Sequence, residues 1–301
     1  MQPRHLMMAL AVAAIWGFNF VVIKVALANF PPLFLVAIRF AIAALPALFL
    51  PRPAISWRQL ILISMTLFLG QYGFLFPAIA YGMPPGLASI VLQIQAFLTI
   101  LIAALFLRER PSMRQISGTI TAGLGLLVIG INLGGDVTGL GLGLTLASAL
   151  SWAFGNVLLR RAGKVDMLPM IVWLSLIPPL PLLGLSFLLE GPVAINTAIH
   201  SVTWLTGGAA LYIAFISTIV GFAFWGYLLK VYPAGTVAPF ALLVPIFGAV
   251  SSALLLGEKF GSARLLGMIL VMTGLVIVAF PWPWQKNKGS QDKAKPVLAK
   301  T

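Results

Sequence analysis

Long apolar runs alternate with short polar connections along almost the whole chain. A helix needs about 20 mostly apolar residues to cross the hydrocarbon core of a bilayer. The pattern therefore predicts ten membrane-spanning helices, at about residues 6–27, 32–50, 58–80, 86–107, 114–131, 139–160, 168–188, 204–228, 236–256 and 262–280. We interpret the connection from Glu190 to Val202 as a loop. The first run resembles a signal peptide, but it continues to about Ala28 without a polar cleavage region and is interpreted as a retained span.

Composition agrees with an integral membrane protein. Of the 301 residues, 60% are hydrophobic and 8% are charged, and the mean hydropathy is +1.06. Soluble domains carry about a quarter of charged residues. The net charge of +13 does not indicate nucleic-acid binding, because the cations are not interleaved with aromatic residues on a polar face. With no cysteine in the chain, disulfides, thiolate catalysis and Cys metal sites are excluded.

The cations are distributed unequally between the two sides that ten spans imply. Most are predicted to lie on the same side of the membrane as the N-terminus: Arg4, Arg52, Arg58, Arg108, Arg110, Arg114, Arg160, Arg161, Lys164, Lys230 and five lysines of the C-terminal tail. The other side receives only Lys24, Lys259 and Arg264. By the positive-inside rule, we expect a multi-pass protein of a bacterial-type inner membrane with both termini in the cytoplasm.

One segment of the sequence occurs twice. A shift of 149 residues (233 − 84) aligns Pro84-Pro85-Gly86 with Pro233-Ala234-Gly235 and Glu109 with Glu258 without a gap. The same shift aligns Gly118 with Gly267 and Gly125 with Gly274, and these glycines are expected to permit close helix packing. A shift of 136 residues aligns Trp16 with Trp152. The chain is therefore predicted to contain two copies of one unit.

Five spans per copy is an odd number, so the second copy must enter the membrane in the opposite direction. We expect a first repeat at residues 1–134, an inverted second repeat at 135–284, and a basic cytoplasmic tail without regular structure at 285–301. Inverted repeats are characteristic of secondary transporters, whose two halves move around a site near the middle of the membrane.

Several motifs together resemble the EamA family of the drug/metabolite transporter superfamily. They are Trp16-Gly-Phe-Asn-Phe-Val-Val-Ile-Lys24, Pro31-Pro32 before Arg39-Phe40, Tyr81-Gly-Met-Pro-Pro-Gly-Leu-Ala-Ser89, Leu107-Arg-Glu-Arg110, and the pair Gly118 and Gly125. Within the family, the chain is most similar to bacterial amino-acid exporters, of either the broad aromatic or the cysteine/O-acetylserine type. The resemblance implies an all-helical inner-membrane carrier of ten helices with a central cavity, which exports amino acids such as Phe, Thr and Met, or other small metabolites.

Arg39 is a candidate ligand for the substrate. It lies about 10 Å into the second span, where exposure to lipid would cost roughly 2.5 to 3.5 kcal/mol. The side chain must therefore face protein or water. It either attracts a substrate carboxylate or ties helix ends together through backbone carbonyls.

Other mid-span polar and aromatic residues are candidates for the cavity lining. Trp16 with Asn19, and Trp152 with Asn156, form equivalent pairs in the first and sixth spans, and either line the cavity or pack between helices. Gln93 and Gln95 cannot both face the cavity, because they are two residues apart. Tyr81 is either an interfacial residue or a gate. The complete set of candidates is Trp16, Asn19, Arg39, Gln71, Tyr72, Tyr81, Gln93, Trp152, Asn156, Ser217 and Thr218.

Prolines mark where the spans can bend. Pro46, Pro178, Pro239 and Pro245 are candidate hinges, or otherwise tolerated kinks.

The acidic residues lie outside the spans or at their ends, and His5 and His200 are placed in the tail and a loop. Proton-coupled pumps usually carry a carboxylate or His within the membrane, so our hypothesis is gradient-driven export without a carboxylate relay. A membrane enzyme would need paired carboxylates, a metal cluster or an activated nucleophile, and none is indicated. We therefore expect no catalytic residues, metal or cofactor. The expected partners are amino acids and the lipid bilayer, without nucleic acid, and the chain is expected to act as a monomer. The remaining alternative is a helical scaffold or sensor that does not transport.

Overall fold

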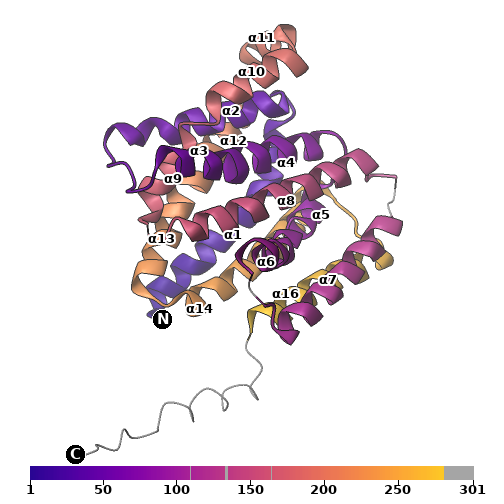
Figure 1. Ribbon diagram of the computed structural model, residues 1–301. Coiled ribbons are helices and arrows are strands. Elements are labelled where there is room, and N and C mark those ends of the chain that lie inside the picture. Colours follow the sequence, from indigo (N-terminus) through magenta and orange to yellow (C-terminus); the bar gives the residue numbers. More distant parts are fainter. Residues whose placement is uncertain (109, 133–134, 164, 281–301) are drawn as a thin grey trace, which may run out of the picture.

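The computed structural model describes residues 1–108, 110–132, 135–163 and 165–280, and every regular element in these ranges is helical (Figure 1). Within this part of the chain, 9 helical segments are long and apolar enough to cross a membrane. The remaining predicted span, Pro32–Leu48, is apolar but shorter. Nine of the ten predicted spans are therefore confirmed as apolar helical segments of sufficient length, and the second falls short of that length. The expected tail at 285–301 and Glu109 lie outside the described residues.

The first half of the chain contains seven α-helices, a short 3₁₀-helix (η1) and a short π-helix (η2). They are α1 (Pro3–Ala26), α2 (Pro32–Ala44), η1 (Leu45–Leu48), α3 (Trp57–Ser64), η2 (Met65–Gly70), α4 (Gln71–Ala80), α5 (Pro85–Val91), α6 (Ile94–Leu107) and α7 (Met113–Ile131). The second half continues with α8 (Gly139–Arg161), α9 (Met167–Ser175), α10 (Pro179–Leu189), α11 (Pro192–His200), α12 (Trp204–Leu211), η3 (Tyr212–Val220), α13 (Gly221–Val231), α14 (Ala234–Val237), η4 (Ala238–Leu242), α15 (Leu243–Leu256) and α16 (Ser262–Ala279).

Two expectations were wrong. The connection after Glu190 is not simply a loop, because it contains α11, which projects with α10 from one end of the molecule (Figure 1). His5 does not lie in a tail: α1 begins at Pro3, and the His5 side chain is 4% exposed. Its Nδ1 lies 2.8 Å from the hydroxyl of Tyr232, and this contact with the end of the eighth span explains its burial. His200 is the last residue of α11.

Corresponding elements of the two halves make corresponding contacts. Helix α1 packs against α12, η3 and α13, whereas α8 packs against α3, η2 and α4. Both partners begin in the same way, because Ser56 and Thr203 each form a capping box at the N-terminus of the following helix. Each half therefore places its first span against the third span of the other half.

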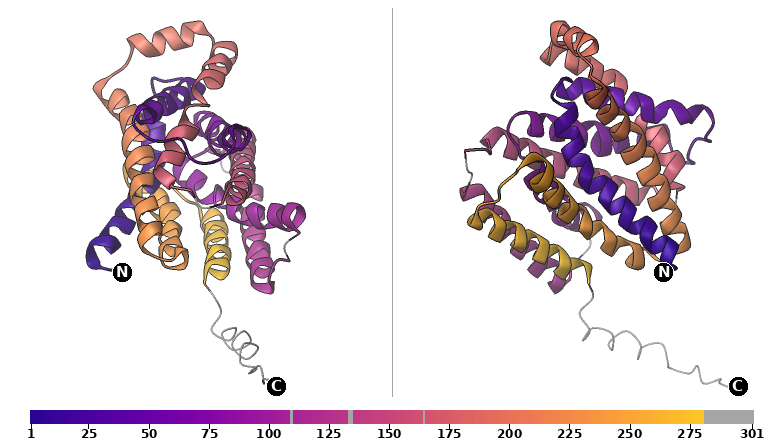
Figure 2. Two further views of the ribbon diagram at one scale, coloured as in Figure 1. Left: turned by 60° about the vertical axis from the view of Figure 1, so that its left-hand side comes forward. Right: turned by 180° about the vertical axis from the view of Figure 1, so that it is seen from behind.

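Helices α7 and α16 lie side by side at the edge of the bundle (Figures 1 and 2). Their crossing depends on glycine, since a Cβ on Gly118 would lie 2.7 Å from the carbonyl oxygen of Gly274. A Cβ on Gly125 would lie 2.6 Å from the carbonyl oxygen of Gly267. The predicted role of these four glycines in close packing is confirmed.

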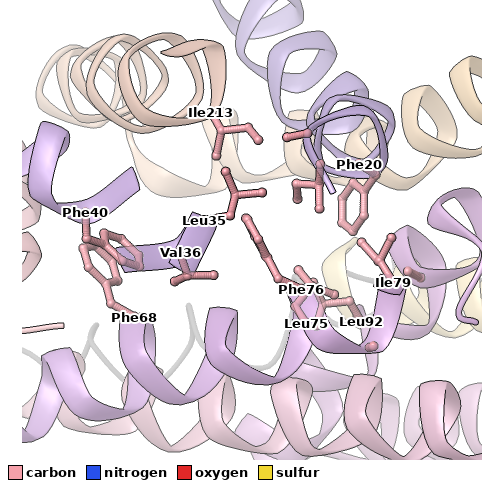
Figure 3. Close-up of a cluster of buried hydrophobic side chains, with 14 of the residues drawn as sticks. Phe20, Leu35, Val36, Phe40, Phe68, Leu75, Phe76, Ile79, Leu92 and Ile213 are labelled. Carbon is pink, nitrogen blue, oxygen red and sulfur yellow. The ribbon is translucent and has the colours of Figure 1, made fainter. Parts of the chain in front are cut away.

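A continuous apolar core connects the first, second, third, fourth and eighth spans. Figure 3 shows Phe40 beside Phe68 on one side of this core and Phe76 within it. The rings of Phe40 and Phe68 are stacked with their centroids 4.7 Å apart. The core holds in place the helices whose polar residues are described below.

Several spans are interrupted near their middles. The third and eighth spans contain π-helical segments, η2 and η3, and the fourth is broken between α5 and α6. Three of the candidate hinges lie at irregular positions: Pro46 in η1, Pro178 at the N-cap of α10, and Pro239 in η4. Pro245 instead lies within α15 and is buried. Their role as hinges stays a prediction.

Candidate functional site

The π-helical segment η3 brings together side chains from three spans. Trp16 of α1 donates from Nε1 to the carbonyl oxygen of Ser217 at 3.0 Å. Arg39 of α2 donates from Nε to Oγ1 of the adjacent Thr218 at 3.1 Å. The Thr218 hydroxyl in turn donates to the carbonyl oxygen of Ile213 at 2.9 Å. π-Helical segments within α-helices occur frequently at functional sites, and the nine-residue η3 contacts both the first and second spans.

The Arg39 guanidinium is buried among aromatic rings. The side chain is 2% exposed, and its Cζ lies 4.0 Å from the centroid of the Tyr72 ring and 5.3 Å from that of Phe40. Its Nη1 atom is buried and has no hydrogen-bond partner among the described residues. Since an unpaired buried donor is costly, Nη1 is chemically suited to donate to an anionic group that enters this region.

Trp16 and Asn19 lie in the same region of α1. The Trp16 ring packs 5.1 Å from Phe222 and 5.4 Å from Trp225, centroid to centroid. Gly221 permits this contact, because a Cβ there would be 2.6 Å from Trp16 Nε1. Asn19 is 7% exposed, and its Oδ1 has no hydrogen-bond partner among the described residues. An acceptor and a donor are thus left unpaired on α1 and α2, and both helices contact η3.

A second polar contact joins α6 and α8 in a separate cluster. Asn156 donates from Nδ2 to Oε1 of Gln95 at 2.8 Å. Gln93 instead donates to the carbonyl oxygen of Ser89 at 3.3 Å within its own span. Gln95, and not Gln93, therefore makes the contact between spans. The half-buried Trp152 packs against the main apolar core.

The remaining candidates are separate from η3. Gln71 is 4% exposed, and its backbone carbonyl oxygen accepts a hydrogen bond from the Ser148 hydroxyl at 2.7 Å. Tyr81 is 52% exposed at the C-terminal end of α4. The structure therefore groups Trp16, Arg39, Tyr72, Ser217 and Thr218 around η3, places Asn19 on an adjoining helix, pairs Asn156 with Gln95, and leaves Gln71 and Tyr81 elsewhere.

Two glutamates that the sequence did not single out cap helices of the other half. Glu258 accepts hydrogen bonds from the backbone N–H groups of Gly86 at 2.8 Å and Leu87 at 3.0 Å. Glu190 accepts from those of Leu33 at 2.7 Å and Phe34 at 3.2 Å. The signal in the sequence was the Pro-Pro start of α2 and α5, whose first N–H groups need acceptors.

The Glu258 cap borders a pocket of about 610 Å³ at the end of α1 that is remote from the N-terminus. Charges of both signs line this pocket, from Lys24, Asp136, Glu258 and Lys259. Burial raises the pKa of the Glu258 carboxyl above its ordinary value, and the Asp136 charge adds to the rise, while the two backbone donors oppose it.

Asp136 is ion-paired with Arg264 through both carboxylate oxygens. The hydrogen bonds from Arg264 hold the pKa of the Asp136 carboxyl below its ordinary value. Among the described residues, no group of three or more His, Cys, Asp or Glu side chains could hold a metal ion.

Comparison with known proteins identifies relatives of the whole chain. A probable amino-acid metabolite efflux pump of Escherichia coli is 41% identical over 294 residues, which cover 95% of this chain and 98% of the relative. A protein of the same description from Salmonella typhimurium is 43% identical over 280 residues, covering 91% and 94%.

A solved crystal structure shares the fold, with a TM-score of 0.61 at 17% identity, and the match covers 92% of this chain and 97% of that one. The model of the EamA-like transporter family matches residues 4–131 and 139–280. The resemblance inferred from the motifs is thus confirmed, and the chain belongs to the EamA-like transporter family.

Proposed function

We propose that this protein exports amino acids from the bacterial cytoplasm, with broad specificity for aromatic and other neutral substrates such as Phe, Thr and Met. Two relatives with more than 40% identity over nearly their full lengths are described as probable amino-acid metabolite efflux pumps. In this proposal the protein is a carrier in the inner membrane and not an enzyme.

The observation that carries the proposal is the unpaired chemistry beside η3. An α-amino acid at neutral pH presents a carboxylate and an ammonium group. The buried Arg39 Nη1 can donate to the carboxylate, and the buried Asn19 Oδ1 can accept from the ammonium. The ring of Tyr72 beside Arg39, and that of Phe222 beside Trp16, would offer apolar contacts to the substrate side chain. This lining accounts for recognition of the common part of amino acids with a variable side chain.

The proposed mechanism is alternating access by two inverted repeats of five spans. The 149-residue repeat in the sequence and the matched packing of α1 and α8 support this arrangement. The excess of cations on the side of the N-terminus supports cytoplasmic termini. On this topology, the pocket that contains Glu258 faces the periplasm.

Transport by purified protein in liposomes tests the proposed function. We expect exchange of labelled Phe across the membrane, with competition by Thr and Met. The substitution Arg39→Ala should reduce the rate by at least about tenfold, because it removes a charged donor that is already desolvated. Arg52→Ala is the matched control, since Arg52 is exposed and its Cζ lies over the Trp57 ring, 4.9 Å from the centroid.

Substrate analogues separate the roles of the two polar groups. Phenethylamine, which lacks the carboxylate, should compete poorly with labelled Phe for transport by the parent protein. In Arg39→Ala, the difference between unlabelled Phe and phenethylamine as competitors should disappear. If no amino acid is exchanged by the parent protein, the proposed function is wrong. If exchange occurs and Arg39→Ala leaves it unchanged, the function stands but the site does not.

A further inference from the structure

The N-terminal half of the fourth span is completely enclosed. All seven residues of α5 are buried, and the helix packs against α1 and α15. The Ser89 hydroxyl donates to the carbonyl oxygens of Gly86 at 2.6 Å and of Pro245 at 3.3 Å. A Cβ on Gly248 would lie 2.5 Å from the Ser89 Oγ, so α5 and α15 are in close contact. These contacts close the molecule at the end where α5 begins.

The corresponding part of the ninth span is packed differently. The shift of 149 residues relates Ser89 to Ala238, the first residue of η4 (89 + 149). None of the five residues of η4 is buried, and Ala238 is exposed. The two equivalent segments therefore differ in packing: α5 is buried within the protein, whereas η4 lies at its surface.

Glu258 is the carboxylate that caps α5, as Glu190 caps α2. Glu258, which follows α15, reaches across to the first repeat and accepts the N–H groups of Gly86 and Leu87. The fit is close, because a Cβ on Gly86 would lie 2.9 Å from Oε2 of Glu258 and 2.9 Å from the Phe260 ring. The charged pocket lies beside this contact and is lined both by Glu258 and by Pro85, the first residue of α5.

We propose that Glu258 is a positioning residue of the transport cycle, whose hydrogen bonds to Gly86 and Leu87 hold the end of the molecule remote from the N-terminus closed. When these hydrogen bonds are lost, α5 separates from α15 and that end opens. Assignment of this end to the periplasm rests on the proposed function, but the closing role of Glu258 does not.

Thiol labelling tests the proposal without any knowledge of the substrate. The chain has no cysteine, so Ser89→Cys and Ala238→Cys each introduce a unique thiol. In lipid nanodiscs, where both faces meet solvent, N-ethylmaleimide should label the thiol at position 238 rapidly and the thiol at position 89 slowly, since Ser89 is 0% exposed.

Adding Glu258→Ala should speed labelling at position 89 by at least about tenfold, because two buried N–H groups lose their acceptor. It should also slow labelling at position 238, as the opposite end closes. Gly86→Ala should act in the same direction, since its methyl group displaces the carboxylate. Glu190→Ala is the matched control, because it removes an equivalent cap from α2 and should leave both rates unchanged.

Two outcomes would overturn the proposal. One is protection at position 89 that survives both Glu258→Ala and Gly86→Ala. The other is faster labelling at both positions together, which would show general loosening of the fold. Neither outcome bears on whether the protein transports amino acids, which the liposome assay decides separately.

Discussion

The segments at the start of the fourth and ninth spans are related by sequence but differ in structure. The first forms α5, in which every residue is buried and which Glu258 caps. The second forms α14 and η4, and η4 has no buried residue. The segments also differ in sequence, because the shift of 149 residues places Pro239 at the position of Ile90 (90 + 149), and a proline interrupts the hydrogen bonding of an α-helix. In the proposed alternating-access mechanism, each half would adopt the packing of the other in turn.

The largest loss of stability is expected from a substitution where α1 crosses α15. A Cβ on Gly17 would lie 2.4 Å from the Phe247 Cβ and 2.7 Å from the Val244 carbonyl oxygen. Gly17→Ala should therefore lower the thermal unfolding temperature in detergent, at a cost of about 1–3 kcal/mol for overpacking. Gly143→Ala on α8 is the control, because its Cβ would meet nothing within 4 Å. Equal unfolding temperatures for the two variants would show that the closed end is not tightly packed.

A smaller loss of stability is expected for the polar contact between α6 and α8. Removing the hydrogen bond between Asn156 and Gln95 by Asn156→Ala should cost about 0.6 kcal/mol, as for hydrogen bonds between membrane helices in general. A double-mutant cycle with Gln95→Ala, measured by thermal unfolding, isolates the coupling free energy between the two side chains. A coupling energy of zero would mean that the two amides do not interact.

The ion pair beside the closed end should give a pH-dependent effect of up to about 1 kcal/mol, because Asp136 is half-exposed. Its pKa is held below the ordinary value by Arg264, so the stabilisation is present above the ordinary aspartate pKa of about 3.9 and is lost as the pH falls through the lowered value. Asp136→Asn should therefore be less stable than the parent at pH 7 and equally stable in strong acid. A difference that stays constant with pH would contradict this assignment.

The smallest effect concerns the protonation of Glu258. Burial raises its pKa in the closed packing, so this packing binds the proton more tightly than one in which the carboxyl meets water. The closed packing should thus become more stable as the pH falls through the raised pKa. The ratio of the labelling rate at position 89 with Glu258 present to the rate in the Glu258→Ala background should therefore fall a few-fold. The charged groups around this carboxyl are Lys24, Asp136, Lys259 and Arg264. A ratio that does not vary with pH would exclude titration of Glu258 as the cause.

The positions of the spans were predictable because length and hydropathy alone determine whether a helix can cross a membrane. The glycines between α7 and α16 were predictable for a similar reason, since their spacing repeats in both halves. Helix α11 was missed because it is a short helix of nine residues between a Gly-Pro start and a polar end.

The site was only partly predictable. Arg39 could be identified because a cation in a span must find partners, but its contact with Thr218 depends on the π-helical geometry of η3, which leaves no pattern in the sequence. The choice between Gln93 and Gln95 depends on the helix break after α5, which changes the direction of every later side chain. Glu258 was overlooked as a cap because a carboxylate in a short loop normally faces solvent.

The central claim is that the two ends of the molecule open in turn as substrate passes. Its most direct test is labelling of Ser89→Cys and Ala238→Cys in nanodiscs as Phe is added. The account predicts that saturating Phe raises the labelling rate at position 89 and lowers it at position 238, with both changes abolished by Arg39→Ala. Rates that do not respond to any transported amino acid, or that rise together at both positions, would contradict it.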